Sequence, residues 1–115
     1  MSPKNPSRIG SQSRAPALIF AALGDATRLR LVARLCGGEP RSISDLTRGS
    51  RLTRQAITKH LSVLQNAGVV CRFRSGRHSL FKFHPQPIDA LRDYLDFVSE
   101  QWDHALARLK SLVER

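Results

Sequence analysis

The stretch from Leu46 to Ile88 is the part of this chain whose residue types could do chemistry, because it concentrates positive charge. It contains no Asp or Glu and eight basic residues: Arg48, Arg51, Arg54, Lys59, Arg72, Arg74, Arg77 and Lys82. Guanidinium and ammonium groups bind phosphate oxygens, and charge that no carboxylate opposes attracts polyanions. These residues therefore favour noncovalent binding of a polyanion.

Two predicted elements hold these charges in place. A helix is expected over Thr53–Ala67, because Ile57, Leu61 and Leu64 recur at spacings of four and three residues and form a buried row. The opposite face of this helix carries Thr53, Arg54, Gln55, Thr58 and Lys59. The segment Val69–His84 alternates around a glycine turn, which predicts a hairpin of two strands.

The turn before the helix and the hairpin add five residues to the same candidate surface: Arg51, Arg72, Arg74, Arg77 and His78. A helix that fits the major groove, with a basic hairpin beside it, is typical of a DNA-binding protein. We expect Arg54, Gln55 and Thr58 to contact base edges, whereas Lys59 suits a base or a phosphate equally. As the N-cap, Thr53 would leave the first helix amides pointing at a phosphate. The alternatives are a solvated helix face and edge-strand charges that prevent aggregation.

The charge of the chain is unevenly distributed. The net charge is +10 over 115 residues, and six of the nine acidic residues lie in the last 27 positions. The length suits one domain, which we place at residues 15–115, with a disordered basic N-terminal arm at 1–14. No apolar run approaches the roughly 20 residues that a membrane span needs, so we expect no membrane insertion and a cytoplasmic protein.

Three shorter helices are expected before the basic stretch. The first is an apolar helix over Ala15–Leu23. Asp25 is a suitable N-cap for the second, which the glycines at 37 and 38 end. Ser42 begins a Ser-x-x-Asp pattern that resembles a capping box and starts the third.

From Pro87 the sequence predicts one long helix with an apolar seam. The seam repeats at alternating spacings of three and four over nearly four heptads, and it includes Ile88, Leu91, Leu95, Val98, Trp102 and Leu109. At about 1.5 Å per residue the helix would extend roughly 40 Å, more than a domain of this size covers by itself. We therefore expect the seam to lie in a dimer interface.

Five segments follow one another in an informative order: Leu23–Arg30 (LGDATRLR), Ser44–Leu46 (SDL), Leu52–Leu64 (LTRQAITKHLSVL), Asn66–Val70 (NAGVV) and Arg74–Arg77 (RSGR). Together they resemble the ArsR (ArsR/SmtB) family of bacterial winged-helix repressors. Each segment alone is weakly diagnostic, but their order and spacing are fairly specific. The resemblance covers the chain from Ala15 to its C-terminus.

The resemblance implies a mainly α (α+β) fold. This is a winged helix-turn-helix with a two-stranded β-hairpin wing and a long C-terminal dimerisation helix. It also implies a homodimer in which the first and last helices pair, which adds Phe20 to the expected interface. In such a dimer two recognition helices enter successive major grooves of an imperfect palindrome, and binding at a promoter represses transcription.

The chain departs from the metal-sensing members of that family. Their third helix carries Cys-x-Cys immediately before Asp-Leu, whereas the matching positions here are Ser42 and Ser44. A hydroxyl is a poor ligand for soft or borderline metals. A second familiar site on the last helix is not reproduced, because its aspartates have only His104 downstream. We expect no metal site and no cofactor, and the sequence identifies no inducer.

The remaining reactive side chains have ordinary interpretations. His60 is expected to be packed and hydrogen-bonded rather than a ligand. Cys36 and Cys71 are expected to be reduced thiols, and they would form a redox switch only if the fold brought them together.

These observations predict a sequence-specific DNA-binding transcriptional regulator, expected to be a homodimeric repressor with double-stranded DNA as its partner. One alternative is a nonspecific architectural DNA-binding protein that uses the same surface. Another is a redox- or ligand-responsive regulator that acts through a different protein. An enzyme is not expected, because the sequence has no Ser, His and Asp grouping and no Gly-rich phosphate loop.

Overall fold

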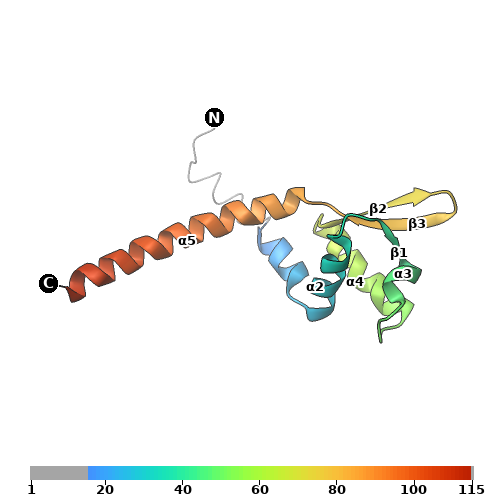
Figure 1. Cartoon of the computed structure of the whole chain (residues 1–115), viewed down its shortest axis with the longest axis horizontal. Coiled ribbons are helices and arrows are strands. Elements are labelled where there is room, and N and C mark those ends of the chain that lie inside the picture. Colours follow the sequence, from blue (N-terminus) through green and yellow to red (C-terminus); the bar gives the residue numbers. More distant parts are fainter. Residues whose placement is uncertain (1–15, 115) are drawn as a thin grey trace.

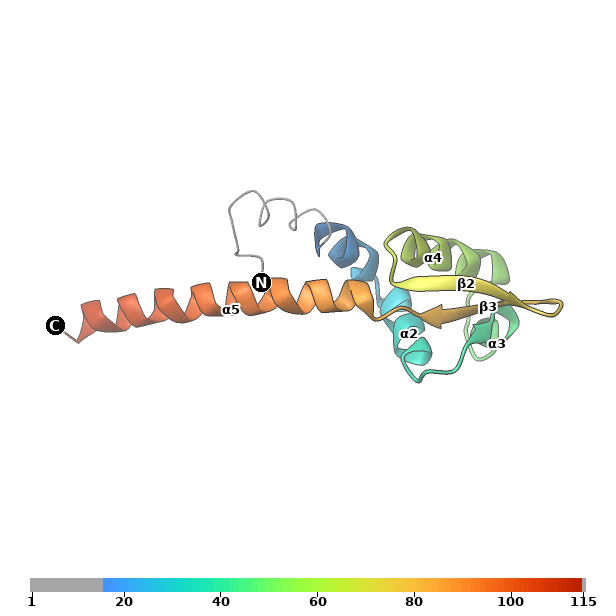
Figure 2. The same cartoon turned by 90° about the horizontal axis from the view of Figure 1, so that it is seen from above.

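The computed structural model describes residues 16–114, and it places a helical body between two projections that point in opposite directions (Figures 1 and 2). One projection is a hairpin of β2 (Val70–Ser75) and β3 (His78–Phe83). The other is the long helix α5 (Gln86–Val113). The expected arm at residues 1–14 lies outside the described part of the chain.

The body between the projections consists of helices. It contains a helix at residues 16–23, α2 (Ala26–Leu35), α3 (Ile43–Thr47) and α4 (Arg54–Asn66). The turn between α3 and α4 completes a helix-turn-helix, and the hairpin follows α4 as the wing. The predicted winged helix-turn-helix with a long C-terminal helix is therefore confirmed.

The sheet has one strand more than the sequence predicted. β1 (Arg41–Ser42) pairs antiparallel with β3, which also pairs with β2, so the strand order is β1-β3-β2. Two residues are too few to show the alternation that marks a strand in a sequence. β1 becomes a strand through its register with Phe81 and Leu80, and it ties the start of α3 to the wing.

Capping residues fix where the helices begin. The Asp25 carboxylate accepts the backbone N–H of Arg28 at 3.0 Å, and Ser42 Oγ accepts that of Asp45 at 3.1 Å. The Asp45 side chain accepts the Ser42 N–H in return, which completes a capping box. Thr53 caps α4 in the same way, by accepting an N–H of its first turn. All three predicted N-caps are confirmed.

One apolar core joins the helices to the sheet. Its most completely buried side chains are Leu35, Leu46, Ile57, Leu61, Leu64 and Val69. Fully burying a side chain of this size stabilises a fold by about 1.5 to 3 kcal/mol, so the row on α4 fixes that helix firmly. Leu91, at 6% exposure, brings the first turns of α5 into the same core, and the rest of α5 extends away from the body.

Candidate nucleic-acid interface

The polar face predicted for α4 is exposed. Its members are Thr53, Arg54, Gln55, Thr58 and Lys59, and each is open to solvent. They face outward because Ile57, Leu61 and Leu64 turn the other side of α4 into the core. The structure therefore gathers all five on the N-terminal half of one helix, next to the amides that Thr53 caps.

Two of these side chains already have hydrogen-bond partners. Arg54 Nη1 donates to Ser44 Oγ at 3.3 Å, and this hydrogen bond holds the guanidinium next to α3. Thr58 Oγ1 donates to the Arg54 carbonyl at 2.8 Å, so its methyl group and lone pairs are what it offers to a ligand. Within residues 16–114, the side chains of Gln55 and Lys59 make no hydrogen bond or ion pair.

The wing presents its basic residues at and near its tip. Gly76, with φ at +62°, makes the turn between β2 and β3, and Arg77 and His78 lie beside it in exposed positions. Arg72 and Arg74 are exposed on β2, and Arg72 Nη2 donates to Ser79 Oγ at 3.3 Å across the hairpin. All the predicted wing residues therefore lie on the projecting part of the sheet.

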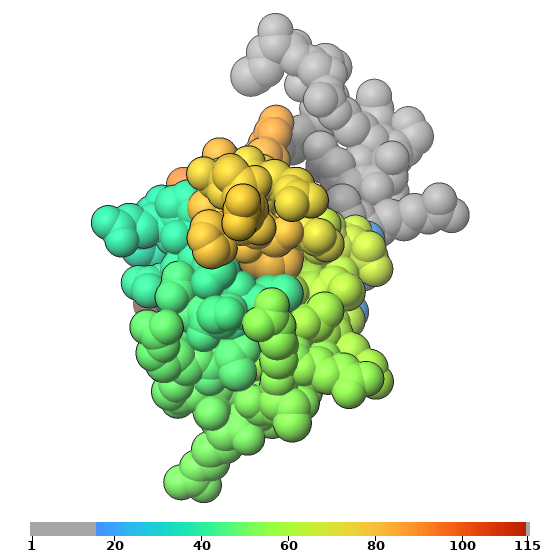
Figure 3. All heavy atoms as spheres, turned by 90° about the vertical axis from the view of Figure 1, so that its right-hand side faces the viewer, coloured from blue at the N-terminus to red at the C-terminus, as the bar shows by residue number. Residues whose placement is uncertain are grey.

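The register shows which way the wing arginines face. Side chains two residues apart on a strand share a face, so Arg72 and Arg74 lie on the same face as Val70. Val70 pairs with Phe83 and Arg72 pairs with Phe81, which is buried against the helices. Arg72 and Arg74 lie further along the hairpin than the part of the sheet that packs on the helices. Their guanidinium groups therefore project on the side of the sheet that carries α4. From the wing end, hairpin, turn and α4 form one continuous face (Figure 3).

No carboxylate neutralises this surface in the described part of the chain. Among residues 16–114, Lys110 forms an ion pair with Glu114 and His60 lies near Asp25, and neither contact involves the arginines of α4 or of the wing. Arg51, in the turn before α4, is also exposed and without a carboxylate partner in this range. The arginines of α4, of the wing and of this turn therefore have no ion-pair partner in this range.

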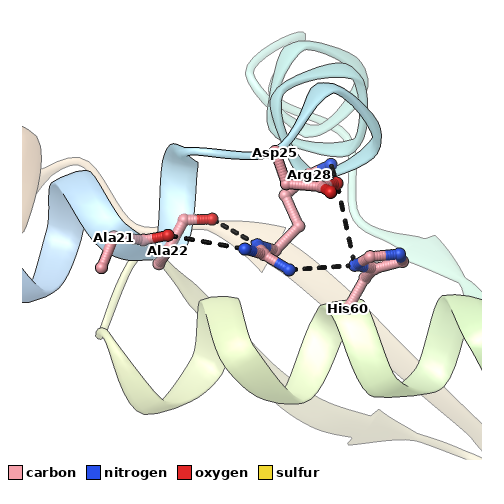
Figure 4. Close-up of polar contacts among 5 residues, drawn as sticks. All are labelled: Ala21, Ala22, Asp25, Arg28 and His60. Atoms are coloured by element: carbon pink, nitrogen blue, oxygen red, sulfur yellow. Dashed lines mark hydrogen bonds and ion pairs between the residues drawn. The ribbon is translucent and has the colours of Figure 1, made fainter.

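A junction of partly buried charged and polar groups holds the side of α4 that carries His60 (Figure 4). Arg28 donates from Nε and Nη2 to the carbonyls of Ala22 and Ala21, which end the helix at residues 16–23. Its Nη1 lies 3.2 Å from Nδ1 of His60 on α4. The Asp25 carboxylate lies 3.9 Å from the same His60 nitrogen. One guanidinium therefore links three helices, and His60 is hydrogen-bonded as predicted.

The same junction affects the ionisation of Asp25. The Arg28 backbone N–H that this carboxylate accepts lowers the pKa of Asp25 below its usual value, and the Arg28 and His60 side chains act in the same direction. The capping hydrogen bond from the Ser42 backbone likewise lowers the pKa of Asp45. Both carboxylates are therefore stabilised in the charged form in which they cap their helices.

The positions that match the cysteines of metal-sensing relatives have structural partners here. Ser42 Oγ accepts the capping bond from Asp45, and Ser44 Oγ accepts the bond from Arg54. Cys36 is exposed at the end of α2 and Cys71 is half-buried on β2, and both thiols are free. These serines therefore serve the helix-turn-helix itself.

The residues predicted for a dimer interface fall into two groups. Ile88 is half-buried against the core and Leu91 is buried in it, so the protomer itself covers these two side chains. The periodicity of the sequence could not predict this internal packing, because a heptad seam does not show whether the same chain or another one covers it. The start of α5 is thus an internal packing element.

The outer residues of the seam are exposed. Leu95, Trp102 and Leu109 are 51%, 63% and 57% exposed, and Val98 is half-buried. Phe20 is exposed on the helix at residues 16–23, and its ring meets that of Tyr94 on α5 edge to face, with centroids 6.1 Å apart. The first and last helices therefore form one apolar surface on the side away from the wing.

Sequence reasoning missed two arginines beside the helix-turn-helix. Arg30 and Arg34 lie on α2, outside the acid-free stretch, and they line a cavity of about 470 Å³ together with Arg51. The spacing of these residues along the chain gives no signal for this grouping, because the turn between α3 and α4 brings Arg51 to α2 only in the folded state.

Comparison with known proteins agrees with this geometry. Residues 23–70 match the family described as "Helix-turn-helix domain". The chain is 34% identical over 104 residues to "HTH-type transcriptional regulator Rv2034" of Mycobacterium tuberculosis, covering 90% of this chain and 94% of that one. It is 27% identical over 90 residues to "Arsenic resistance transcriptional regulator ArsR1" of Pseudomonas putida, covering 76% and 70%.

Solved structures give the same result. The "ArsR-like Transcriptional Regulator from Rhodococcus sp. RHA1" superimposes with a TM-score of 0.78 at 31% identity, over 89% of this chain and 95% of that one. No helix within residues 16–114 is long and apolar enough to span a membrane. The shared helix-turn-helix, the exposed basic face and these relatives together show that this chain belongs to the ArsR family of winged helix-turn-helix, DNA-binding transcriptional regulators.

Proposed function

We propose that this regulator is a homodimeric repressor that binds an imperfect palindrome in a promoter. In this proposal Arg54, Gln55, Thr58 and Lys59 on α4 read bases in the major groove. Thr53 and Arg51 contact phosphate at the start of the helix, and the wing lies along the neighbouring backbone or minor groove. The observation that carries the proposal is the exposed basic surface of α4 and the wing, two elements that contain no Asp or Glu and are both visible from the wing end.

Dimerisation is supported by the exposed apolar surface of α5. Besides Leu95, Trp102 and Leu109, the helix exposes Leu106, Leu112 and Val113 by more than half. A monomeric protein rarely leaves so long an apolar strip in water, whereas a second copy of the same helix would cover it. Phe20 and Tyr94 extend this surface toward the body, so the helix at residues 16–23 would join the interface.

Selection of bound DNA from a random duplex pool tests the proposal. A two-fold dimer should enrich two related half-sites whose centres lie about 34 to 36 Å apart, which is one turn of duplex. Enrichment of a single unrepeated site would contradict the symmetric dimer. Recovery of sequences without any shared motif would instead favour a nonspecific architectural protein.

A salt titration separates specific from architectural binding. Nonspecific binding is almost entirely counterion release, whereas a specific operator adds about 4 to 10 kcal/mol from base contacts. We expect the selected operator to keep this advantage over its scrambled sequence at every salt concentration. Loss of the difference would support the architectural alternative.

Mass measurement addresses the remaining alternative, in which α5 pairs with another protein. We expect sedimentation equilibrium of the purified chain to give twice the 12.9 kDa of one protomer. A stable monomer at micromolar concentration would favour a heterologous partner.

A further inference from the structure

A cleft opens between α2 and the turn that leads into α4. Its volume is about 470 Å³, and it is lined by residues of α2, α3, the α3–α4 turn and α4. Leu31, Leu46 and Ile57 form its apolar floor, and all three belong to the buried core. The cleft is therefore a fixed feature of the helix-turn-helix.

Three arginines line this cleft: Arg30, Arg34 and Arg51. No Asp or Glu lines it, and none of the three arginines forms an ion pair in the described part of the chain. The aliphatic stems of arginines can cover an apolar floor while their charged ends stay in water. Such a concentration of positive charge fits an anionic ligand.

Arg34 is held in place without being neutralised. Its Nη1 and Nη2 donate to the carbonyls of Leu46 and Asp45, both at 2.9 Å. Carbonyl acceptors orient a guanidinium but carry no net charge. Arg30 and Arg51 are exposed, and their side chains have no hydrogen-bond partner among residues 16–114. Arg34 thus provides a fixed positive charge, and Arg30 and Arg51 provide free donors.

The place of the cleft relative to α4 suggests which anion could reach it. The turn residues that line it immediately precede Thr53, so the cleft lies beside the end of α4 that we expect in the major groove. Packed helices lie about 8 to 10 Å apart, and the major groove is about 12 Å wide. With α4 in the groove, α2 would therefore lie over a sugar–phosphate strand that borders it.

We infer that this cleft is a phosphate-binding part of the DNA interface, in which Arg30, Arg34 and Arg51 hold the backbone beside the groove that α4 reads. The inference rests on the proposed function and adds α2 to the DNA-contacting elements. Arginine is suited to this role because its planar donors bind phosphate oxygens in pairs. The contact would fix the position of α4 along the duplex and carry no sequence information itself.

The experiment compares Arg30→Gln with the wild type. Arg30 is chosen because its side chain is exposed, whereas Arg34 also supports α3. The slope of log K against log salt is negative, and each lost phosphate contact should reduce its magnitude by about 0.9, or by about 1.8 for the two protomers of a dimer. Affinity for the operator and for scrambled DNA should fall by the same factor. Arg108→Gln, an equal change of charge on the outer part of α5, is the matched control and should keep the wild-type slope.

Three results would overturn the inference. The first is an unchanged salt slope for Arg30→Gln, and the second is a loss of affinity for the operator alone, which would make Arg30 a base contact. The third is that the DNA-free protein binds inorganic phosphate saturably at submillimolar concentration, as NMR would show, while the salt slope of DNA binding is unchanged in Arg30→Gln. In each case the wild type would still bind its operator, so the proposed function would stand. A wild type that binds no duplex at low salt would end both proposals.

Discussion

At the scale of single residues, the side chains on α4 differ in how free they are to meet a base. Arg54 and Thr58 make hydrogen bonds to Ser44 and to the helix backbone. Gln55 makes none within residues 16–114, so its amide is available without breaking an existing contact. Gln pairs naturally with adenine, because its amide matches one donor and one acceptor on the base edge.

Replacing Gln55 with Ala should weaken operator binding by about 1 to 3 kcal/mol and relax the preference at one position in each half-site. Fluorescence anisotropy with the selected operator and its single-base variants would measure both effects. Gln65→Ala, an exposed Gln near the other end of the same helix, is the control and should change neither. Equal weakening on every sequence would assign Gln55 to the backbone instead.

The sequence predicted the exposed row of α4 because helical periodicity alone separates Ile57, Leu61 and Leu64 from the residues between them. It did not predict the bond from Arg54 to Ser44 or the contact of Arg28 with His60, which join residues 10 and 32 positions apart. Such pairings depend on how the helices cross. The grouping of Arg30 with Arg51 was missed for the same reason.

At the scale of elements, Arg28 is the side chain that fixes the helices against one another. It satisfies carbonyls at the end of the helix at residues 16–23 and also reaches His60 on α4. Carbonyls at a helix end have no partner within their own helix, so an external donor stabilises them. Arg28 therefore adds a polar link between the first helix and the recognition helix to the apolar core that they share.

Replacing Arg28 with Met should lower the free energy of unfolding by about 1.5 to 3 kcal/mol, the usual contribution of a hydrogen bond to a charged group. Urea unfolding at one protomer concentration would measure the change. Arg30→Met, in the same helix but exposed, should stay within about 0.5 kcal/mol of the wild type. Equal destabilisation by the two substitutions would contradict the linking role of Arg28.

Acid should weaken the fold through the caps of α2 and α3. The pKa values of Asp25 and Asp45 are lowered by the backbone N–H groups that they accept, so each stabilises the fold at pH values above its unfolded pKa. This stabilisation is lost as the pH falls through the lower folded values. Urea unfolding from about pH 6 to pH 2 should show a decline below about pH 4. Asp25→Asn should make that decline shallower, and a decline as steep as in the wild type would argue against this cause.

The helix boundaries were largely predictable because capping is a local interaction. Asp25, Ser42 and Thr53 each bond to an amide three residues later, and that spacing is visible in the sequence. β1 was not predictable, because its two residues become a strand only when Phe81 and Leu80 pair with them.

At the scale of the whole molecule, one apolar surface of the described chain is left uncovered. The first turns of α5 pack on the body through Leu91, while Trp102 and the leucines after it remain exposed. The sequence predicted the seam but did not separate its inner part from its outer part, because both parts have the same repeat. The expected dimer interface therefore begins near Leu95 and runs outward.

Replacing Trp102 with Glu should split the dimer and abolish tight operator binding. The dimer should split because a charge in the seam would have to be buried against the partner protomer. Operator binding should then weaken because a monomer binds one half-site without the gain in effective concentration that the second protomer provides. Sedimentation equilibrium would measure the mass. Ala107→Glu adds the same charge at an exposed position outside the seam and should remain dimeric. A dimeric Trp102→Glu variant would mean that the outer seam is not the interface.

The extension of α5 away from the body also affects hydrodynamic behaviour. The radius of gyration is 18.7 Å, whereas a globular chain of this length has about 13 Å. A lone protomer, 67 Å in its longest extent, would experience high friction and leave a sizing column early, as a heavier globular protein does. The apparent mass from the elution volume could then suggest a dimer for a protein that is monomeric. Stoichiometry should therefore come from light scattering or another measurement that is independent of shape.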